Sequence, residues 1–208
     1  MSAAAYSTVR PAQAELTVKR SRFLGYAYPV RDEDELKARV AALKALFKTA
    51  THICYGAVYD KTGAALRFSD DGEPGGTAGK PILDAIRGRG LCETLVAVVR
   101  WFGGVKLGTG GLSRAYGDCA AAVLDRAEPI VMTLSDRFRV TAEPALYARA
   151  ERGLRAFCTV QDVTYGEKVV VLAAAPGGSG AEARLNGLFA GKGVVEFLET
   201  AYVEEEKR

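Results

Sequence analysis

Histidine is almost absent from this sequence, and its cysteines are not paired. The 208 residues include one histidine, His52, and four scattered cysteines without a Cys-x-x-Cys motif. These features exclude a histidine-rich metal centre and predict reduced core thiols, not disulfides or zinc ligands. We therefore expect neither a bound metal nor another cofactor.

Long hydrophobic runs and a strong net charge are also missing. No apolar run approaches the ~20 residues that cross a bilayer, and residues 1–8 lack the basic start and apolar block of a secretory signal. We therefore expect a cytoplasmic protein without a membrane partner. The net charge is only +3, but residues 1–134 carry 18 Lys and Arg against 14 Asp and Glu. Any polyanion should therefore bind the N-terminal part.

Glycine, by contrast, is concentrated in two segments. In the first, an apolar run at Leu95–Val99 predicts a buried strand, and five glycines follow between positions 103 and 111. An amphipathic helix then begins near Leu112. The free N–H groups at a helix start favour an anion, and Lys106 and Arg114 lie on either side of this point. The alternative, that the glycines only permit a tight strand-to-helix turn, stays open at this stage.

The second glycine segment, Ser69–Leu83, contains four glycines and two prolines and predicts a long shaped loop. Its acidic residues, Asp70, Asp71 and Glu73, either hold Mg²⁺, cap turns or pair with basic side chains. We favour turns and pairing, because magnesium sites usually complete themselves with substrate phosphates. We assign these three residues, with Gly76, Thr77 and Gly79, to the loop scaffold.

The order of predicted elements divides the chain at residues 1–133 and 134–208. Residues 1–12 are small and polar and are expected to be loose, and Pro129–Asp136 reads as a linker. After the linker, the pattern is βαββαβ, which is typical of a ferredoxin-like domain. The sequence as a whole predicts an α+β protein.

Four motifs, taken together, closely resemble the signature of the YigZ/IMPACT family. They are Ser21–Phe23, Ala50–Tyr55, Ser69–Leu83 and Val99–Tyr116. One departure is Gly75, where the family pattern has serine, so a hydroxyl-dependent role at that position is in doubt. Trp101 in place of the commoner tyrosine is a second and milder departure.

The resemblance implies an IMPACT-type N-terminal domain similar to the second domain of a small-subunit ribosomal protein. It also implies a C-terminal domain similar to the ferredoxin-like domains of a translocating elongation factor. Such relatives are associated with ribosomes, RNA or translational control, and the eukaryotic IMPACT proteins bind a regulator of an amino-acid-sensing kinase. Kinship of fold does not by itself give the function.

The first functional hypothesis is therefore a non-enzymatic protein that binds RNA or the ribosome, without DNA sequence specificity. Backbone amides at a glycine loop and separate cations suit the phosphates of A-form RNA. The candidate phosphate-binding residues are Arg22, Lys80, Arg100, Gly104, Lys106, Gly108, Gly110, Gly111 and Arg114. Trp101 or Tyr116 either stacks on an exposed base or belongs to the core.

Two other hypotheses have different chemistry. The glycine loop can seat a small phosphorylated ligand of an enzyme or sensor, with Asp70, Asp71 or Glu73 holding a metal or accepting a proton. Peptidase or other hydrolase activity is the third, with Cys54 as nucleophile and His52 as base, because residues two apart on a strand point the same way.

Overall fold

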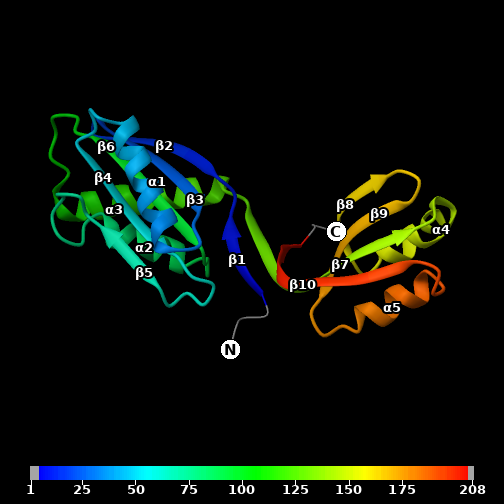
Figure 1. Cartoon of the computed structure of the whole chain (residues 1–208). Helices are drawn as coiled ribbons and strands as arrows, with labels where there is room; N and C mark the ends of the chain where they lie inside the picture. The colour runs from blue at the N-terminus through cyan, green and yellow to red at the C-terminus, as the bar shows by residue number, and fades with distance from the viewer. Residues whose placement is uncertain (1–4, 206–208) are drawn as a thin grey trace. The chain divides into compact units, whose positions relative to one another are not determined.

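The chain forms two compact units, Met1–Val131 and Met132–Arg208 (Figure 1). A computed structural model describes residues 5–205. Both units combine helices with antiparallel strand pairs, so the predicted α+β class is confirmed. The particular fold names, ribosomal-protein domain-2-like and ferredoxin-like, remain predictions.

The first unit is built on a five-stranded sheet in the order β2-β3-β6-β4-β5. Its strands are β2 (Ala12–Val18), β3 (Ser21–Pro29), β4 (His52–Val58), β5 (Leu66–Ser69) and β6 (Thr94–Trp101). The central strand, β6, is an apolar run because both of its faces are covered. Val96 and Val98 enter one core cluster, whereas Ala97 and Val99 enter another on the opposite face.

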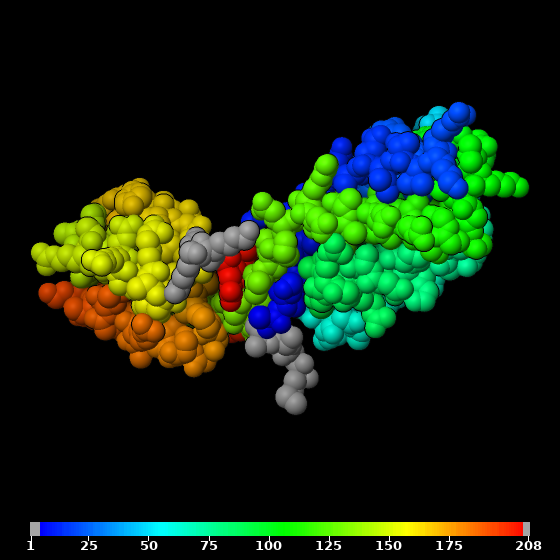
Figure 2. All heavy atoms as spheres, turned by 180° about the vertical axis from the view of Figure 1, so that it is seen from behind, coloured from blue at the N-terminus to red at the C-terminus, as the bar shows by residue number. Residues whose placement is uncertain are grey.

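Helices cover both faces of this sheet (Figure 1). Helix α1 (Glu33–Leu46) packs its buried side chains against one face, and α2 (Gly79–Arg87) and α3 (Gly108–Arg126) pack together against the other. The surfaces of α3 (green) and of the α2 region (blue-green) adjoin on one side of the unit (Figure 2). The two glycine-rich segments are the connections that enter α2 and α3.

The prediction that residues 1–12 are loose is wrong for the part that the structure describes. Residues Ala5–Val9 form β1, in which Tyr6 and Val9 are buried. The Ser7 carbonyl accepts a hydrogen bond from the Cys92 amide at 2.8 Å. Because its partners lie more than 80 residues away, the local sequence gave little sign of this strand. Residues 1–4 lie outside the described range.

The second unit has the element order βαββαβ. It consists of β7 (Pro129–Ala142), α4 (Pro144–Arg155), β8 (Thr159–Tyr165), β9 (Val169–Pro176), α5 (Ala181–Leu188) and β10 (Val194–Glu204). These strands lie in the order β10-β7-β9-β8, and both helices contribute to one core cluster on the sheet. The linker predicted at Pro129–Asp136 is wrong, because Met132–Asp136 pair with Thr200–Glu204 of β10.

Within the described range of the chain, the helices are too short or too polar to cross a lipid bilayer.

Candidate functional site

The two glycine-rich segments meet at one pocket of the first unit, with a volume of about 430 Å³. Glu73 and Pro74 come from the segment before α2, and Phe102, Lys106 and Gly108 come from the segment before α3. The remaining lining residues belong to the start of β4, the end of β6 and the first turn of α3: Thr51, His52, Arg100, Leu107, Thr109 and Leu112.

Asp70 folds the first segment around its own side chain. Its carboxylate accepts hydrogen bonds from the amides of Gly76, Ala78 and Gly79 at 2.8, 3.0 and 2.8 Å. Desolvation raises the pKa of Asp70, but these backbone donors outweigh it and leave the pKa below its usual value. Thr77 adds a hydrogen bond from its hydroxyl to the Pro74 carbonyl at 2.7 Å. The carboxylate therefore serves the loop scaffold.

Asp71 connects this loop to β4 and fixes the ring of His52. The Asp71 carboxylate accepts from Lys44 Nζ and from the Ile53 amide, both at 2.7 Å. The Asp71 carbonyl lies 2.8 Å from His52 Nδ1. A carbonyl oxygen can only accept a hydrogen bond, so His52 Nδ1 carries the proton. The other ring nitrogen, Nε2, lies 3.9 Å from Glu73 Oε1. Among the described residues, no three His, Cys, Asp or Glu side chains are grouped as metal ligands.

A buried ion pair forms the floor of the pocket. Arg100 and Glu73 are 5% and 8% exposed, and an Arg100 terminal nitrogen donates to Glu73 Oε1. The Tyr116 hydroxyl donates to the same oxygen at 2.7 Å. The other terminal nitrogen of Arg100 donates to Ser21 Oγ at 3.3 Å, whereas its Nε has no hydrogen-bond partner among the described residues. Buried charges persist when they are paired in this way.

The N-terminus of α3 is open at the pocket. Gly108, its first residue, has φ +73°, a conformation that favours glycine. The preceding residue, Leu107, provides no side-chain cap, and the first turn contains no acidic residue. The first amides of the helix are therefore available to an anion. Lys106 is exposed beside them and forms no ion pair within the described part of the chain.

Neither the backbone conformation nor the packing requires glycine at position 110, in the first turn of α3. It is absent from the residues with positive φ, and a Cβ placed on it would meet no atom within 4 Å. Side chains on a helix tilt toward its N-terminus, so glycine here keeps the helix end uncovered. Gly75 has the same open surroundings, so the structure gives no packing reason for the loss of the family's serine at this position.

The predicted phosphate-binding residues are only partly brought together. Arg100, Lys106 and Gly108 line the pocket. Gly104 lies on the connection between β6 and α3, and Gly110 and Gly111 lie in the first turn of α3, but these three do not line the pocket. Lys80 pairs with Asp84 on the surface of α2 at 2.9 Å. Arg22 pairs with Glu15 at 2.8 Å and lies 4.8 Å from the centre of the Trp101 ring. Arg114 is exposed on α3, outside the pocket lining.

The aromatic residue that was missed is Phe102. Its side chain is 48% exposed and lines the pocket. Tyr116, one of the two stacking candidates, is fully buried, and Trp101 packs edge-on against Phe47. A phenylalanine next to a glycine-rich turn at the end of a buried strand was the available signal in the sequence.

The nucleophile proposed for a hydrolase is wrong. Cys54 is fully buried, and its thiol donates to the Asp70 carbonyl at 3.0 Å. Burial raises the pKa of this thiol to about 12, so the reactive thiolate is not formed near neutral pH. His52 lines the pocket without Cys54.

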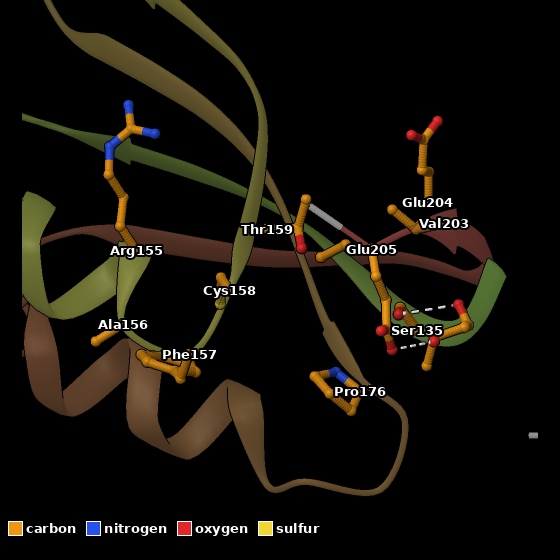
Figure 3. A pocket seen from close by; sticks show the side chains of 12 residues that line it. Ser135, Arg155, Ala156, Phe157, Cys158, Thr159, Pro176, Val203, Glu204 and Glu205 are labelled. Carbon is orange, nitrogen blue, oxygen red and sulfur yellow. Dashed lines mark hydrogen bonds between the residues drawn. The ribbon is translucent and has the colours of Figure 1, made fainter. Parts of the chain in front are cut away.

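A second hollow, of about 660 Å³, lies in the second unit (Figure 3). Figure 3 shows Arg155 and Glu204 at opposite ends of it, with their charged groups pointing away from its centre. Arg155 is also engaged by Glu151 at 3.1 Å. The third charged residue of the lining, Glu205, accepts a hydrogen bond from the Thr133 hydroxyl. Ligand sites usually have a few convergent polar groups, and Arg155 and Glu204 do not converge here.

Fold and pocket together define a two-unit α+β protein with an anion-compatible pocket in its first unit. The chain belongs to the IMPACT family, because the profile of the Impact N-terminal domain matches residues 19–124. It is 33% identical over 166 residues to the IMPACT family member YvyE of Bacillus subtilis, covering 79% of this chain and 76% of that one.

Two other relatives are matched over a smaller share of their length. An IMPACT family member of Thermus thermophilus is 48% identical over 59% of this chain and 66% of that protein. For a member from Haemophilus influenzae the identity is 40%, over 62% of this chain and 64% of the relative. The chain thus spans less than two thirds of these two relatives. A crystal structure described as that of a hypothetical protein has a TM-score of 0.63 at 29% identity, over 95% of this chain and 98% of that one.

Proposed function

We propose that the chain is a cytoplasmic, non-enzymatic protein of translational control that binds RNA, alone or in the ribosome, at the pocket of its first unit. The observation that carries this proposal is the meeting of both glycine-rich segments at one pocket beside Lys106 and the uncovered start of α3. Membership of the IMPACT family supports the link to translation, since the family resemblance implies ribosomes, RNA or a protein partner as targets.

Phosphate fits this place because the pocket offers both kinds of donor that RNA-binding proteins use. Amides at the start of α3 give directed hydrogen bonds, and Lys106 gives a mobile positive charge. Arg100 contributes less charge than the sequence suggested, because Glu73 already balances it. Arg114 is exposed on α3 and adds a further positive charge to the same unit, whereas Glu15 balances the charge of Arg22.

The salt dependence of RNA binding tests this proposal. Lys106→Gln removes one phosphate contact, so the slope of log affinity against log salt should fall by about 0.7–0.9 and the affinity should weaken for every RNA sequence. The matched control is Lys48→Gln, which removes the same charge from an exposed lysine just after α1 that forms no ion pair within the described residues. Binding that does not respond to salt, or equal slopes for both variants, contradicts the proposal.

A second candidate is a sensor or enzyme that takes a small phosphorylated ligand. It is favoured by the size of the pocket, since about 430 Å³ lies within the ~300–1,000 Å³ of small-molecule sites. A ligand at 100 times its Kd stabilises the folded protein by about 2.7 kcal/mol, which a thermal-shift screen of sugar phosphates and nucleotides detects. No shift with any of them, with or without Mg²⁺, would remove this candidate.

A further inference from the structure

The pocket lining contains two chemically different kinds of group. Lys106 and the first amides of α3 present positive charge and hydrogen-bond donors. Phe102 and Pro74 present apolar surface. An occupant that uses both kinds of group carries an anion and a flat apolar group close together.

The open helix start is not the only unsatisfied feature of this pocket. Arg100 also lines it, is 5% exposed, and keeps its Nε without a hydrogen-bond partner among the described residues. A buried donor without a partner is costly, and such groups are usually satisfied by water or a ligand. This donor belongs to β6 and is independent of the helix start.

The ring of Phe102 lies at the surface of the pocket, where a flat group can stack on it, and is not part of a hydrophobic core. Its ring is 48% exposed and belongs to none of the described core clusters. Its amide donates to Thr51 Oγ1 at 3.0 Å, and the Arg100 guanidinium carbon lies 5.7 Å from the ring centre. These contacts hold the backbone and one side of the ring, while the rest of the ring is left for stacking.

We infer that this pocket receives a single unpaired nucleotide, with the base stacked on Phe102 and the phosphate at Lys106 and the start of α3. The inference rests on the proposed function and specifies which part of an RNA is bound. A base inside a helix is covered on both faces by its neighbours, so only a bulged, looped or terminal nucleotide can present its face to an aromatic ring. The phosphate attached to the same nucleotide supplies the anion.

Two RNA hairpins with the same stem test the inference, one fully paired and one with a single 2-aminopurine bulge. The protein should bind the bulged hairpin about tenfold or more tightly than the paired one, because stacking on one aromatic side chain has about that effect. Binding should also change the fluorescence of the bulged base. Phe102→Ala should abolish both the preference and the fluorescence change, and Phe102→Trp should restore them.

The chain offers a matched control in Phe68, which is 49% exposed on β5 and does not line the pocket. Phe68→Ala should leave the preference for the bulge unchanged. Circular dichroism and thermal melting of each variant show whether it is folded, so that loss of the fold is not taken for loss of stacking.

The other outcomes separate this inference from the proposed function. If the parent and Phe102→Ala bind both hairpins equally and in a salt-dependent way, the inference that the pocket receives an unpaired nucleotide is overturned. The proposal that the protein binds RNA is then still supported. Binding of neither hairpin overturns both. If free adenosine monophosphate binds as tightly as the bulged hairpin, recognition within RNA is overturned and the pocket is assigned to a small nucleotide. If a peptide carboxylate competes for the pocket and nucleotides do not, the inference is overturned and the pocket is assigned to a protein partner.

Discussion

Replacing Gly110 by alanine should make the protein more stable and make it bind RNA less well. The Cβ meets no atom within 4 Å, and the residue has no positive φ, so alanine fits without strain. Alanine in place of a helical glycine stabilises by about 0.5–1 kcal/mol. For a folding unit of this size, the melting temperature should rise by roughly 2–5 °C.

The loss of affinity follows from the position of Gly110 in the first turn of α3. The added methyl tilts toward the end of the helix and keeps a phosphate from the first amides. A hydrogen bond to a charged group contributes about 1.5–3 kcal/mol, so losing one weakens binding about tenfold or more. Fluorescence anisotropy with a labelled RNA hairpin and a melting curve measure the two effects on the same sample.

Gly187→Ala is the matched control, because Gly187 lies in α5 and its Cβ also meets no atom within 4 Å. It should add a similar small stabilisation and leave the affinity for RNA unchanged. If Gly110→Ala is stabilised as expected and binds RNA as tightly as the parent, the amides of α3 do not hold phosphate and the reasoning is refuted.

Three further predictions concern the interior of the first unit. Arg100→Met leaves the Glu73 carboxylate buried without its partner and should cost about 3–5 kcal/mol in urea unfolding; adding Glu73→Gln should recover part of that loss, and equal stabilities of the single and double variants would contradict the pairing. Ellman's reagent at pH 8 should leave the buried Cys54 and Cys119 unmodified until urea is added, since burial raises the pKa of each thiol to about 12. Rapid labelling in the native state of a variant that lacks the other two thiols, Cys92→Ser with Cys158→Ser, would disprove this. Because the pKa of Asp70 is lowered in the folded state, its contribution to stability is present above about pH 4 and is lost as the pH falls through its folded pKa, so Asp70→Asn should flatten the acid limb of a stability–pH curve. An unchanged acid limb would show that Asp70 does not hold the loop.

The elements that could be predicted from the sequence are those whose signals are local. Helix α1 begins directly after Asp32, whose carboxylate accepts a hydrogen bond from the Glu35 amide at 2.8 Å, and this capping pattern of Asp followed three residues later by Glu is visible in the sequence. The apolar run at Leu95–Val99 correctly indicated a buried strand, and the structure shows that both of its faces are covered. Strand β1 and the first half of β7 were missed because their pairing partners are distant in the sequence, although residues such as Tyr6, Val9 and Val131 favour strands.

The site was predictable as two segments but not as a set of contacts. Residues two apart on a strand face the same side, so Arg100 lies on the same face of β6 as Val96 and Val98. These two valines enter the core beneath α2 and α3. This periodicity was a usable sign that Arg100 is buried and must be paired. Its partner, Glu73, lies 27 residues earlier in a loop that Asp70 shapes, and no local pattern connects the two. The exposure of Phe102 likewise depends on tertiary packing.

Binding of RNA at this pocket is tested most directly by titrating ¹⁵N-labelled protein with the bulged RNA hairpin and following the chemical shifts of the backbone amides. If RNA is held at the pocket, the largest changes should fall on Phe102–Leu112 and on Thr51 and His52, which line or flank the pocket. Saturable shifts confined to other residues, with those amides unmoved, would contradict the claim that RNA is held at this pocket.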